Sequence, residues 1–329
     1  MKKTLERLVQ FEELSQQEAK TILIDLTTSD YSEAEMASFL TVYMMRKISL
    51  NELKGFKEAL LELCKPVQLS EFDPIDLCGT GGDGKNTFNI STLAAFVSAG
   101  AGVKVAKHGN YGVSSVSGSS NVLEYLGINF SSDEDFQKKS IEQTGICILH
   151  APLFHPAMKH VGPVRKKLQL KTFFNMLGPM VNPSFPKKQV VGVFNLELLR
   201  MYAYLFQQDK KEFKIIHDLN GYDEVSLTGN TKVFGTHSEE IISPMQFNSQ
   251  PVTENDLYGG KSVKEAAEIF MNVLRVEGTK AQHQVVIANA ALAISLAKNI
   301  SLEQGLIQAE ESLLSKSALH VFNLLKSMN

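Results

Sequence analysis

Residues 76–127 read DLCGTGGDGKNTFNISTLAAFVSAGAGVKVAKHGNYGVSSVSGSSNVLEYLG. Short apolar runs at 75–78 and 103–106 each lead into a loop rich in glycine and polar residues, and helix-like runs follow. This order is typical of a mostly parallel sheet whose strands are joined by helices. Open α/β sheets bind ligands at the carboxyl ends of their strands. The stretch therefore predicts an α/β domain whose loops form a binding site.

The first loop, Gly79 to Lys85, contains four glycines. Glycines at that density let the backbone approach a ligand closely, which favours a phosphate-like ligand. The loop nearly spells the nucleotide-binding motif G-x-x-x-x-G-K-[ST], but Asn86 stands where that motif needs a hydroxyl. Asp83 would also place a carboxylate among the phosphates. A nucleoside triphosphate site is therefore disfavoured.

The second loop, Thr87 to Thr92, precedes the apolar run 93–97. Asn, Ser and Thr before such a run are typical helix N-caps, so a capped helix explains this loop by itself. A helix N-terminus also presents free N–H groups and about half a positive charge. The same residues therefore fit an anion site as well.

The third loop, 107–121, brings a lysine, a histidine, an amide and several serines to the end of the second predicted strand. Each serine alone is typical of a polar surface turn. The combination at a strand end indicates ligand binding.

Several motifs occur in a fixed order along the chain. They are GTGGD (79–83), NIST (89–92), KHGN (107–110), GSSNVLEYLG (118–127), APLFHPA (151–157) and Asp223-Glu224. Their order and spacing resemble the anthranilate phosphoribosyltransferases over nearly the whole chain. The resemblance implies a nucleoside phosphorylase-like α/β fold, with a small helical N-terminal domain and a large domain whose central, mostly parallel sheet is flanked by helices.

The resemblance also implies the reaction. The amine of anthranilate would attack C1 of the ribose in phosphoribosyl pyrophosphate and expel pyrophosphate, in a step of tryptophan synthesis. Such an enzyme mainly positions its substrates and stabilises the charges that develop on them. Because an aromatic amine is neutral at pH 7, the attack needs no strong base.

By resemblance, phosphoribosyl pyrophosphate binds to the three loops. The implied residues are Gly79, Thr80, Gly82, Asp83, Thr87, Asn89, Ile90, Ser91, Thr92, Lys107, Ser115 and Ser119. The resemblance further implies Mg²⁺, two ions with substrate bound, on Ser91, Asp223 and Glu224, and hard oxygen ligands suit this ion. From local sequence alone the acidic pair is a solvated turn. Because neighbours on a straight strand face opposite ways, a shared metal role requires a bend at 221–224.

The same resemblance implies an anthranilate site of Gly79, His108, Asn110, His155 and Arg165. A guanidinium fork suits the carboxylate of anthranilate, although a lone arginine in a basic run is ordinarily surface charge. The histidines would lie near the ring or line its access, and both are equally compatible with packed, hydrogen-bonded positions.

The third loop departs from the family pattern. Tyr111 stands where arginine is usual, and Ser120-Asn121 replace the common Ala-Asp. One charge of each sign is therefore missing from this loop.

The small domain is expected at 1–68, joined by a returning segment around 166–185, and the large domain at 69–329. Three S-x-x-E sequences, beginning at Ser15, Ser32 and Ser49, predict capping boxes and hence helices in the small domain. Later strands are predicted at 146–150, 190–194 and 213–217, with extra strands open to antiparallel pairing at 224–228 and 232–234. Helices are predicted at 133–143, 197–207, 261–274, 281–298 and 301–314.

The composition of the chain limits the kinds of partner that it is expected to bind. The chain has 329 residues, of which 43% are hydrophobic, and its formal charge of −3 supplies no field for nucleic acid or an anionic membrane. The sequence shows no run long enough to span a bilayer. Its three cysteines are far apart, which favours neither a disulfide framework nor a metal site and fits a cytoplasmic protein. The resemblance suggests a homodimer through the helical domain.

Two other functions are alternatives to the transferase. A nucleoside phosphorylase runs related chemistry, but Arg165 together with Asn110 disfavours it. A non-catalytic, nucleic-acid-binding relative would need a basic groove and a damaged metal site. The slightly acidic chain retains Asp223-Glu224, which disfavours that alternative too.

Overall fold

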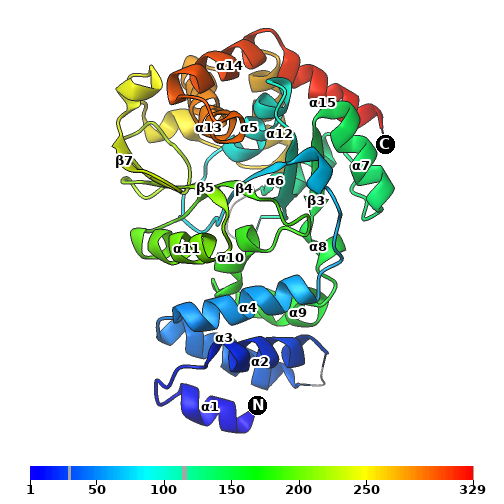
Figure 1. Cartoon of the computed structure of the whole chain (residues 1–329), viewed down its shortest axis with the longest axis vertical. Helices are drawn as coiled ribbons and strands as arrows, with labels where there is room; N and C mark the ends of the chain where they lie inside the picture. Colours follow the sequence, from blue (N-terminus) through cyan, green and yellow to red (C-terminus); the bar gives the residue numbers. More distant parts are fainter. Residues whose placement is uncertain (29–30, 113–116, 329) are drawn as a thin grey trace. The chain divides into compact units, whose positions relative to one another are not determined.

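The computed structural model describes residues 1–28, 31–112 and 117–328, and it divides into two compact units (Figure 1). Unit 1 comprises 1–66 and 151–183, and unit 2 comprises 67–150 and the chain from 184 onward. The return to the helical unit thus begins at Ala151, directly after a strand, and earlier than the expected 166–185. The segment 151–165 carries no sequence signal that separates it from the preceding β-α alternation.

Unit 1 is built from helices only. Its first part contains α1 (Lys2–Leu8), α2 (Gln16–Thr28), α3 (Glu33–Met45) and α4 (Leu50–Glu62). Its second part contains α8 (Ala151–Phe154), α9 (Met158–Leu168), α10 (Phe174–Leu177) and the 3₁₀ turn η2 (Gly178–Met180).

Aromatic side chains join the two parts of unit 1. Phe173 stacks on Phe56 of α4 with ring centroids 4.5 Å apart, and it meets Phe39 and Tyr43 of α3 edge-on. Offset and edge-to-face pairs add to the free energy gained by burying the rings. The returning segment is therefore part of the core of this helical unit.

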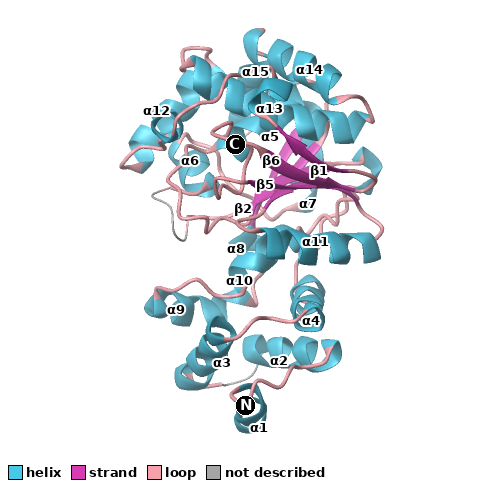
Figure 2. Cartoon of the chain, turned by 90° about the vertical axis from the view of Figure 1, so that its left-hand side faces the viewer, coloured by secondary structure: helices cyan, strands magenta, loops and turns pink. Residues whose placement is uncertain are grey.

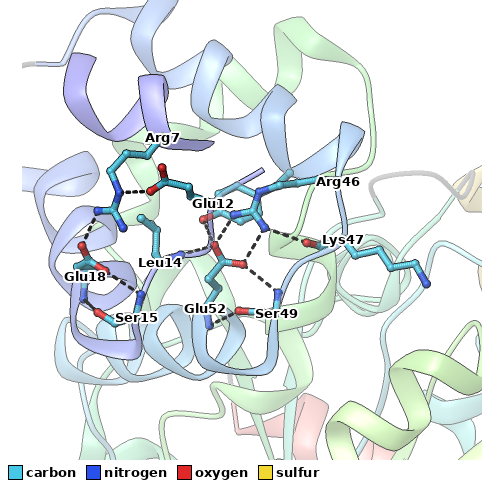
Figure 3. Close-up of polar contacts among 10 residues, drawn as sticks. Arg7, Glu12, Leu14, Ser15, Glu18, Arg46, Lys47, Ser49 and Glu52 are labelled. Atoms are coloured by element: carbon cyan, nitrogen blue, oxygen red, sulfur yellow. Dashed lines mark hydrogen bonds and ion pairs between the residues drawn. The ribbon is translucent and has the colours of Figure 1, made fainter. Parts of the chain in front are cut away.

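The predicted capping boxes are confirmed. Ser32 and Ser49 each accept a bond from the N–H three residues on, and the glutamate there bonds back. Ser15 and Glu18 exchange the same two bonds at 3.3 and 2.8 Å. The glutamate of the third box, Glu52, also ends a buried network, shown in Figure 3.

Unit 2 contains one seven-stranded sheet in the order β3-β2-β1-β4-β5-β6-β7. The first five strands are parallel, as the sequence predicts. The last two pair antiparallel; the sequence leaves that pairing open for the strand at 232–234 and does not predict β7. Their bounds are β1 (Ile75–Gly79), β2 (Val105–Gly109), β3 (Ile146–His150), β4 (Lys188–Gly192), β5 (Glu212–Asp218), β6 (Thr231–Gly235) and β7 (Glu239–Ile242).

Helices flank this sheet on both faces. The helices α5 (Ile90–Gly100) and α13 (Lys280–Lys298) lie over one face, and α11 (Leu196–Gln208) lies on the other (Figures 1 and 2). The remaining helices are α6 (Ser119–Tyr125), α7 (Glu134–Thr144), α12 (Val263–Leu274), α14 (Leu302–Leu314) and α15 (Ser317–Ser327). Short 3₁₀ turns are η1 (Ser70–Phe72), η3 (Pro244–Phe247) and η4 (Glu254–Leu257).

The strand predicted at 224–228 is wrong. The N–H of Val225 donates to the side chain of Asn289 at 3.1 Å, and Leu227 has a φ of 59°, which breaks an extended ladder. Val225, Ser226 and Leu227 are all buried, so this segment packs into the interior without joining the sheet.

Among the described residues, no single helix is long and apolar enough to cross a membrane. The pair α13 and α14 meets such a criterion jointly by length and composition, with a bend of 118° between the two helices. Ten residues of α13 are buried in the core of unit 2.

Candidate active site

The predicted loops meet at the carboxyl edge of the sheet in unit 2. Strands β1 and β4 are parallel neighbours, and their last residues, Gly79 and Gly192, lie opposite each other. From this pair the chain continues towards β2 on one side and towards β5 on the other. Such a point in an open α/β sheet is where ligands bind.

A small cavity opens at this point of the sheet. Its walls come from β1, β4, β5, α5 and α13, together with the segment after β5. The lining residues are Leu77, Cys78, Ser91, Ala94, Val190, Gly192, Ile216, Asp223, Glu224 and Asn289. Three of them, Ser91, Asp223 and Glu224, form the predicted metal-binding set.

The acidic pair reaches this edge through a turn after β5. The N–H of Gly221 donates to the carbonyl of Asp218 at 2.8 Å, and Gly221 has a φ of 92°, which favours glycine. The following carboxylates then bond to different elements. Asp223 Oδ2 accepts from the N–H of Gly81 at 2.7 Å, and Glu224 Oε1 accepts from the N–H of Ser91 at 3.0 Å.

Two strand-end glycines make room for Asp223. A Cβ built on Gly79 would collide with its carboxylate, and one built on Gly192 would collide with its backbone carbonyl. The N–H of Thr80 also donates to the carbonyl of Gly192 at 2.9 Å, which joins the two strand ends. The glycines are therefore required by the close approach of the acidic segment to the sheet.

Burial raises the pKa of both acidic side chains. For Asp223 the neighbouring Asp83 carboxylate raises the pKa further. For Glu224 the charges of Asp223 and Asp83 add to the effect of burial, and the pKa lies well above its usual range. Bonds from Gly81 to Asp223, and from Ser91 and Thr87 to Glu224, oppose this rise only in part. Three carboxyl groups at one place favour the binding of a cation.

The donor set fits Mg²⁺. Two carboxylates and a serine hydroxyl are hard oxygen ligands, and Mg²⁺ is usually held by one or two carboxylates together with substrate phosphates. Within the described ranges, no group of three or more His, Cys, Asp or Glu residues is placed to hold a metal alone. The arrangement therefore suits an ion that arrives with a phosphate ligand better than a resident metal.

The glycine loop and the start of α5 present unpartnered polar atoms. In the part of the chain that the structure describes, Thr80 Oγ1 and Asn89 Oδ1 are buried and have no hydrogen-bond partner. Neither residue lines the cavity, but each is two residues from one that does, Cys78 and Ser91 respectively. Because buried polar atoms are ordinarily paired, these two oxygens are candidates for bonds to a ligand. Gly81, Gly82 and Gly84 all have positive φ, as expected for a loop that curves around a ligand.

The helix start at Asn89 differs from a simple N-cap. Asn89 is the N-cap residue by position, but its side chain does not cap the helix. Its Nδ2 instead donates to the carbonyl of Ser117 at 3.4 Å, which joins the second loop to the third. The N–H of Ser91 is occupied by Glu224, and Ile90 and Thr92 are buried.

Lys107 and His108, predicted to begin the third loop, belong to strand β2 instead. Lys107 is buried, and its Nζ donates to the carbonyl of Leu77 in β1 at 2.6 Å. Burial lowers the pKa of Lys107. The N–H of the next residue, His108, donates to the buried carboxylate of Asp76 at 3.2 Å. Sequence reasoning missed Asp76, whose place at the start of β1 carries no motif of its own.

Asn110 and Ser119 lie together at the end of β2. The hydroxyl of Ser119 donates to the carbonyl of Asn110 at 3.3 Å, and Asn110 is exposed. Ser115, also predicted to bind substrate, lies outside the described residues.

The departures from the family pattern have structural partners. Asn121 Oδ1 accepts from the N–H groups of Gly112 and Gly118, both at 2.9 Å. The Tyr111 hydroxyl donates to Glu124 at 3.2 Å. Ser120 bonds to Nδ1 of His150 at 2.8 Å. The amide and hydroxyls therefore hold this loop without the two usual charges.

The other predicted acceptor residues, His155 and Arg165, belong to unit 1. His155 is buried, Nε2 contacts the carbonyl of Val181 at 2.9 Å, and burial lowers its pKa to about 4. The guanidinium of Arg165 lies 5.0 Å from the ring centroid of Phe174 in α10, and burial lowers its pKa. His155 is therefore a packed, hydrogen-bonded residue, and Arg165 is held against an aromatic ring.

Comparison with known proteins gives the class first. A glycosyl transferase family model for the α/β domain matches residues 71–319, and its helical bundle domain matches residues 2–64. The fold and site are thus those of a glycosyl transferase family enzyme.

Named relatives narrow the class. An anthranilate phosphoribosyltransferase from Flavobacterium psychrophilum is 58% identical over 329 residues, with full coverage of both chains. The Saccharomyces cerevisiae anthranilate phosphoribosyltransferase in complex with PRPP and Mg has a TM-score of 0.90 at 28% identity, covering 98% of this chain and 96% of that one. The yeast enzyme with 4-fluoroanthranilate has a TM-score of 0.87 at 27% identity with the same coverage. The chain belongs to the anthranilate phosphoribosyltransferases. Neither the phosphorylase nor the nucleic-acid-binding alternative is favoured.

Proposed function

We propose that the chain transfers the phosphoribosyl group of phosphoribosyl pyrophosphate to the amine of anthranilate and releases pyrophosphate, as a step of tryptophan synthesis. The observation that carries this proposal is the pair of buried Asp223 and half-buried Glu224, bonded to a glycine loop and to a helix start. A cation bound by these carboxylates would bring a phosphate substrate to the N–H groups and hydroxyls beside them.

The substrate pyrophosphate and ribose bind to the glycine loop, the start of α5 and the third loop. The unpartnered oxygens of Thr80 and Asn89 support this placement. The full proposed set is Gly79, Thr80, Gly82, Asp83, Thr87, Asn89, Ile90, Ser91, Thr92, Lys107, Ser115 and Ser119. Lys107 is buried, and its Nζ bonds to Leu77 in β1. From this position its positive charge stabilises an anion bound near the end of β1.

Ser91, Asp223 and Glu224 hold Mg²⁺, and we propose two ions with substrate bound. The ions supply neutralisation of the leaving pyrophosphate. The protein fixes both carboxylates in advance by N–H bonds from Gly81 and Ser91. Little reorganisation of these side chains is then needed when the charged substrate arrives.

Arg165 binds the carboxylate of anthranilate, and Gly79 and Asn110 hold the amine side. Stacking on Phe174 pre-orients the guanidinium, which lowers the entropy lost on binding. His108 and His155 line the ring. A pKa of about 4 leaves His155 neutral at pH 7, and its contact with Val181 fixes the ring, which supports a packing role over proton transfer.

The domain division, assembly and location are also proposals. The compact units correspond to a helical domain and a phosphoribosyl pyrophosphate-binding domain. Resemblance to the family supports a homodimer through the helical domain and a cytoplasmic location, with small molecules as the ligands and neither nucleic acid nor membrane as a partner.

Pyrophosphate release from phosphoribosyl pyrophosphate and Mg²⁺, with and without anthranilate, tests the reaction in the wild type and in Arg165→Ala. We expect release to depend on anthranilate, and the variant to raise KM for anthranilate about tenfold or more by loss of a charge-assisted bond. If the wild type releases pyrophosphate at the same rate with and without anthranilate, the assignment of anthranilate as the acceptor is wrong. An unchanged KM in the variant would remove Arg165 from the site.

A further inference from the structure

Lys85 closes the glycine loop and is tied to the acidic site by its backbone. Its N–H donates to Asp83 Oδ1 at 3.0 Å, and the N–H of Gly81 in the same loop donates to Asp223 Oδ2 at 2.7 Å. The position of Lys85 therefore follows the position of the carboxyl groups proposed to receive Mg²⁺ and pyrophosphate.

The ammonium group of Lys85 lies between an aromatic ring and a carboxylate. Its Nζ is 4.6 Å from the ring centroid of Tyr222, the residue directly before the acidic pair. It is also 3.4 Å from Glu254 Oε1, at the start of η4. Pairing between the residue after Lys85 and the segment after η4 keeps these groups together, because the N–H of Gly259 donates to the carbonyl of Asn86 at 2.8 Å.

The contact between Lys85 and Glu254 is one that a stronger anion can replace. The Lys85 side chain is 25% exposed and that of Glu254 is 70% exposed, and exposed ion pairs contribute little to stability. Tyr222 is buried and supports the lysine from the other side. The ring thus fixes the lysine while the glutamate is free to give way to a stronger anion.

The charge balance of this site calls for such a cation. Asp83, Asp223 and Glu224 gather three carboxyl groups, while Lys107 is buried on the carbonyl of Leu77. Lys85, at the end of the glycine loop, has a partly exposed side chain.

We propose that Lys85 binds the diphosphate of phosphoribosyl pyrophosphate and that Glu254 holds its ammonium group until the diphosphate replaces the carboxylate. This rests on the proposed function. It assigns Lys85 to substrate affinity, and Tyr222 and Glu254 to the positioning of Lys85.

Isothermal titration calorimetry tests the proposal without catalysis: inorganic pyrophosphate and Mg²⁺ are titrated into the full chain, and the affinity is measured. Lys85→Met is expected to weaken binding about tenfold through loss of a charge-assisted bond, and Lys85→Arg to retain binding within about threefold. Glu254→Gln is expected to bind slightly more tightly because the competing carboxylate is removed. Lys264→Met, which breaks the exposed Lys264–Glu268 pair of α12, is the matched control and is expected to leave binding unchanged.

Steady-state kinetics separates this role from a structural one. In Lys85→Met, KM for phosphoribosyl pyrophosphate should rise while KM for anthranilate stays constant. Unchanged pyrophosphate binding in Lys85→Met, or an equal rise of both KM values with no rescue by arginine, would overturn the proposal. A wild type that binds pyrophosphate but forms no product would instead contradict the proposed function, while the comparison between variants would still decide the role of Lys85.

Discussion

Each compact unit contains a cluster of hydrogen bonds to carboxylate groups. The two clusters differ in how the negative charge of the carboxylates is neutralised. In unit 1, Glu52 accepts from Arg46 Nη1 at 3.0 Å, from the Tyr43 hydroxyl at 3.0 Å and from the N–H of Leu14 at 3.0 Å (Figure 3). In unit 2, Asp223 and Glu224 accept from backbone N–H groups and a hydroxyl and lie beside Asp83. A protein cation completes the first cluster, and the second is arranged for a cation from outside.

The pKa shifts express the same difference. Burial alone would raise the pKa of Glu52, but the bonds from Arg46, Leu14 and Ser49 outweigh it and hold the pKa below its usual value. Burial and neighbouring carboxylates raise the pKa of Asp223 and Glu224. A completed ion pair stabilises its fold, whereas crowded carboxylates reduce stability until a ligand binds.

The largest effect is expected from breaking the completed cluster. Glu52→Gln leaves the buried Arg46 without its counter-charge, which should lower the free energy of unfolding by about 3 to 5 kcal/mol. Urea unfolding monitored by circular dichroism measures this change. Glu18→Gln, which breaks the exposed pair with Arg7, is the control and should cause a much smaller loss. Equal losses in the two variants would show that burial of the Arg46 pair adds nothing.

The second prediction crowds the acidic cluster. In Gly192→Ala the new methyl group collides with the backbone of Asp223, and overpacking of this kind costs about 1 to 3 kcal/mol. Displacement of Asp223 should also lower kcat/KM for phosphoribosyl pyrophosphate by at least about tenfold. Gly162→Ala in α9, where a methyl group would have no neighbour within 4 Å, is the matched control. Full activity in Gly192→Ala would show that the position of Asp223 is not critical.

The third prediction concerns pH, where the two clusters should behave oppositely. The folded-state pKa of Glu52 is lowered, so its contribution is present above the unfolded pKa of about 4.3 and is lost as pH falls through the lower folded value. The folded-state pKa of Asp223 and Glu224 is raised, so the folded state binds more protons than the unfolded state, and without Mg²⁺ stability falls as pH rises from about 4 towards the raised values.

Thermal unfolding without Mg²⁺ between pH 3 and pH 8 measures both effects. The difference in Tm between the wild type and the less stable Glu52→Gln variant should become smaller at the acid end of this range. The Tm of the double variant Asp223→Asn/Glu224→Gln should rise relative to that of the wild type at the alkaline end. Parallel curves for all three proteins would contradict the assigned shifts.

The smallest effect is expected in the third loop. Asn121→Asp restores the usual family residue, and a carboxylate oxygen accepts the same N–H bonds from Gly112 and Gly118. We expect kcat/KM to change by less than about threefold, because the geometry of these bonds is retained. Initial rates at saturating and limiting phosphoribosyl pyrophosphate measure the effect. A large gain would show that the missing negative charge limits this enzyme.

The sequence was most informative where local physics decides the structure. The capping serines, the parallel strands and the glycine loop follow from spacing and backbone freedom, and the predicted residues Ser91, Asp223 and Glu224 lie together. Its limits appear where distant segments meet. The extra strand predicted at 224–228 does not form, and nothing in the sequence shows that Asn289 accepts the backbone bond of Val225.

Long-range partners explain the other gaps as well. The return of the chain at Ala151 depends on packing of Phe173 against Phe56. Burial of Lys107 on Leu77 and the contact of Lys85 with Glu254 also join residues far apart in the sequence. Single-sequence patterns report local periodicity and motif spacing, and they do not report these contacts.

Thermal unfolding with and without phosphoribosyl pyrophosphate and Mg²⁺, in the wild type, Asp223→Asn and Glu18→Gln, tests the central claim most directly. A ligand that binds only the folded state raises Tm by an amount that grows with the logarithm of its concentration divided by Kd. The account predicts a clear rise for the wild type and for Glu18→Gln and a small or absent rise for Asp223→Asn. An equal rise in all three proteins would contradict the claim that the metal-bound substrate completes the site of Asp223 and Glu224 in unit 2.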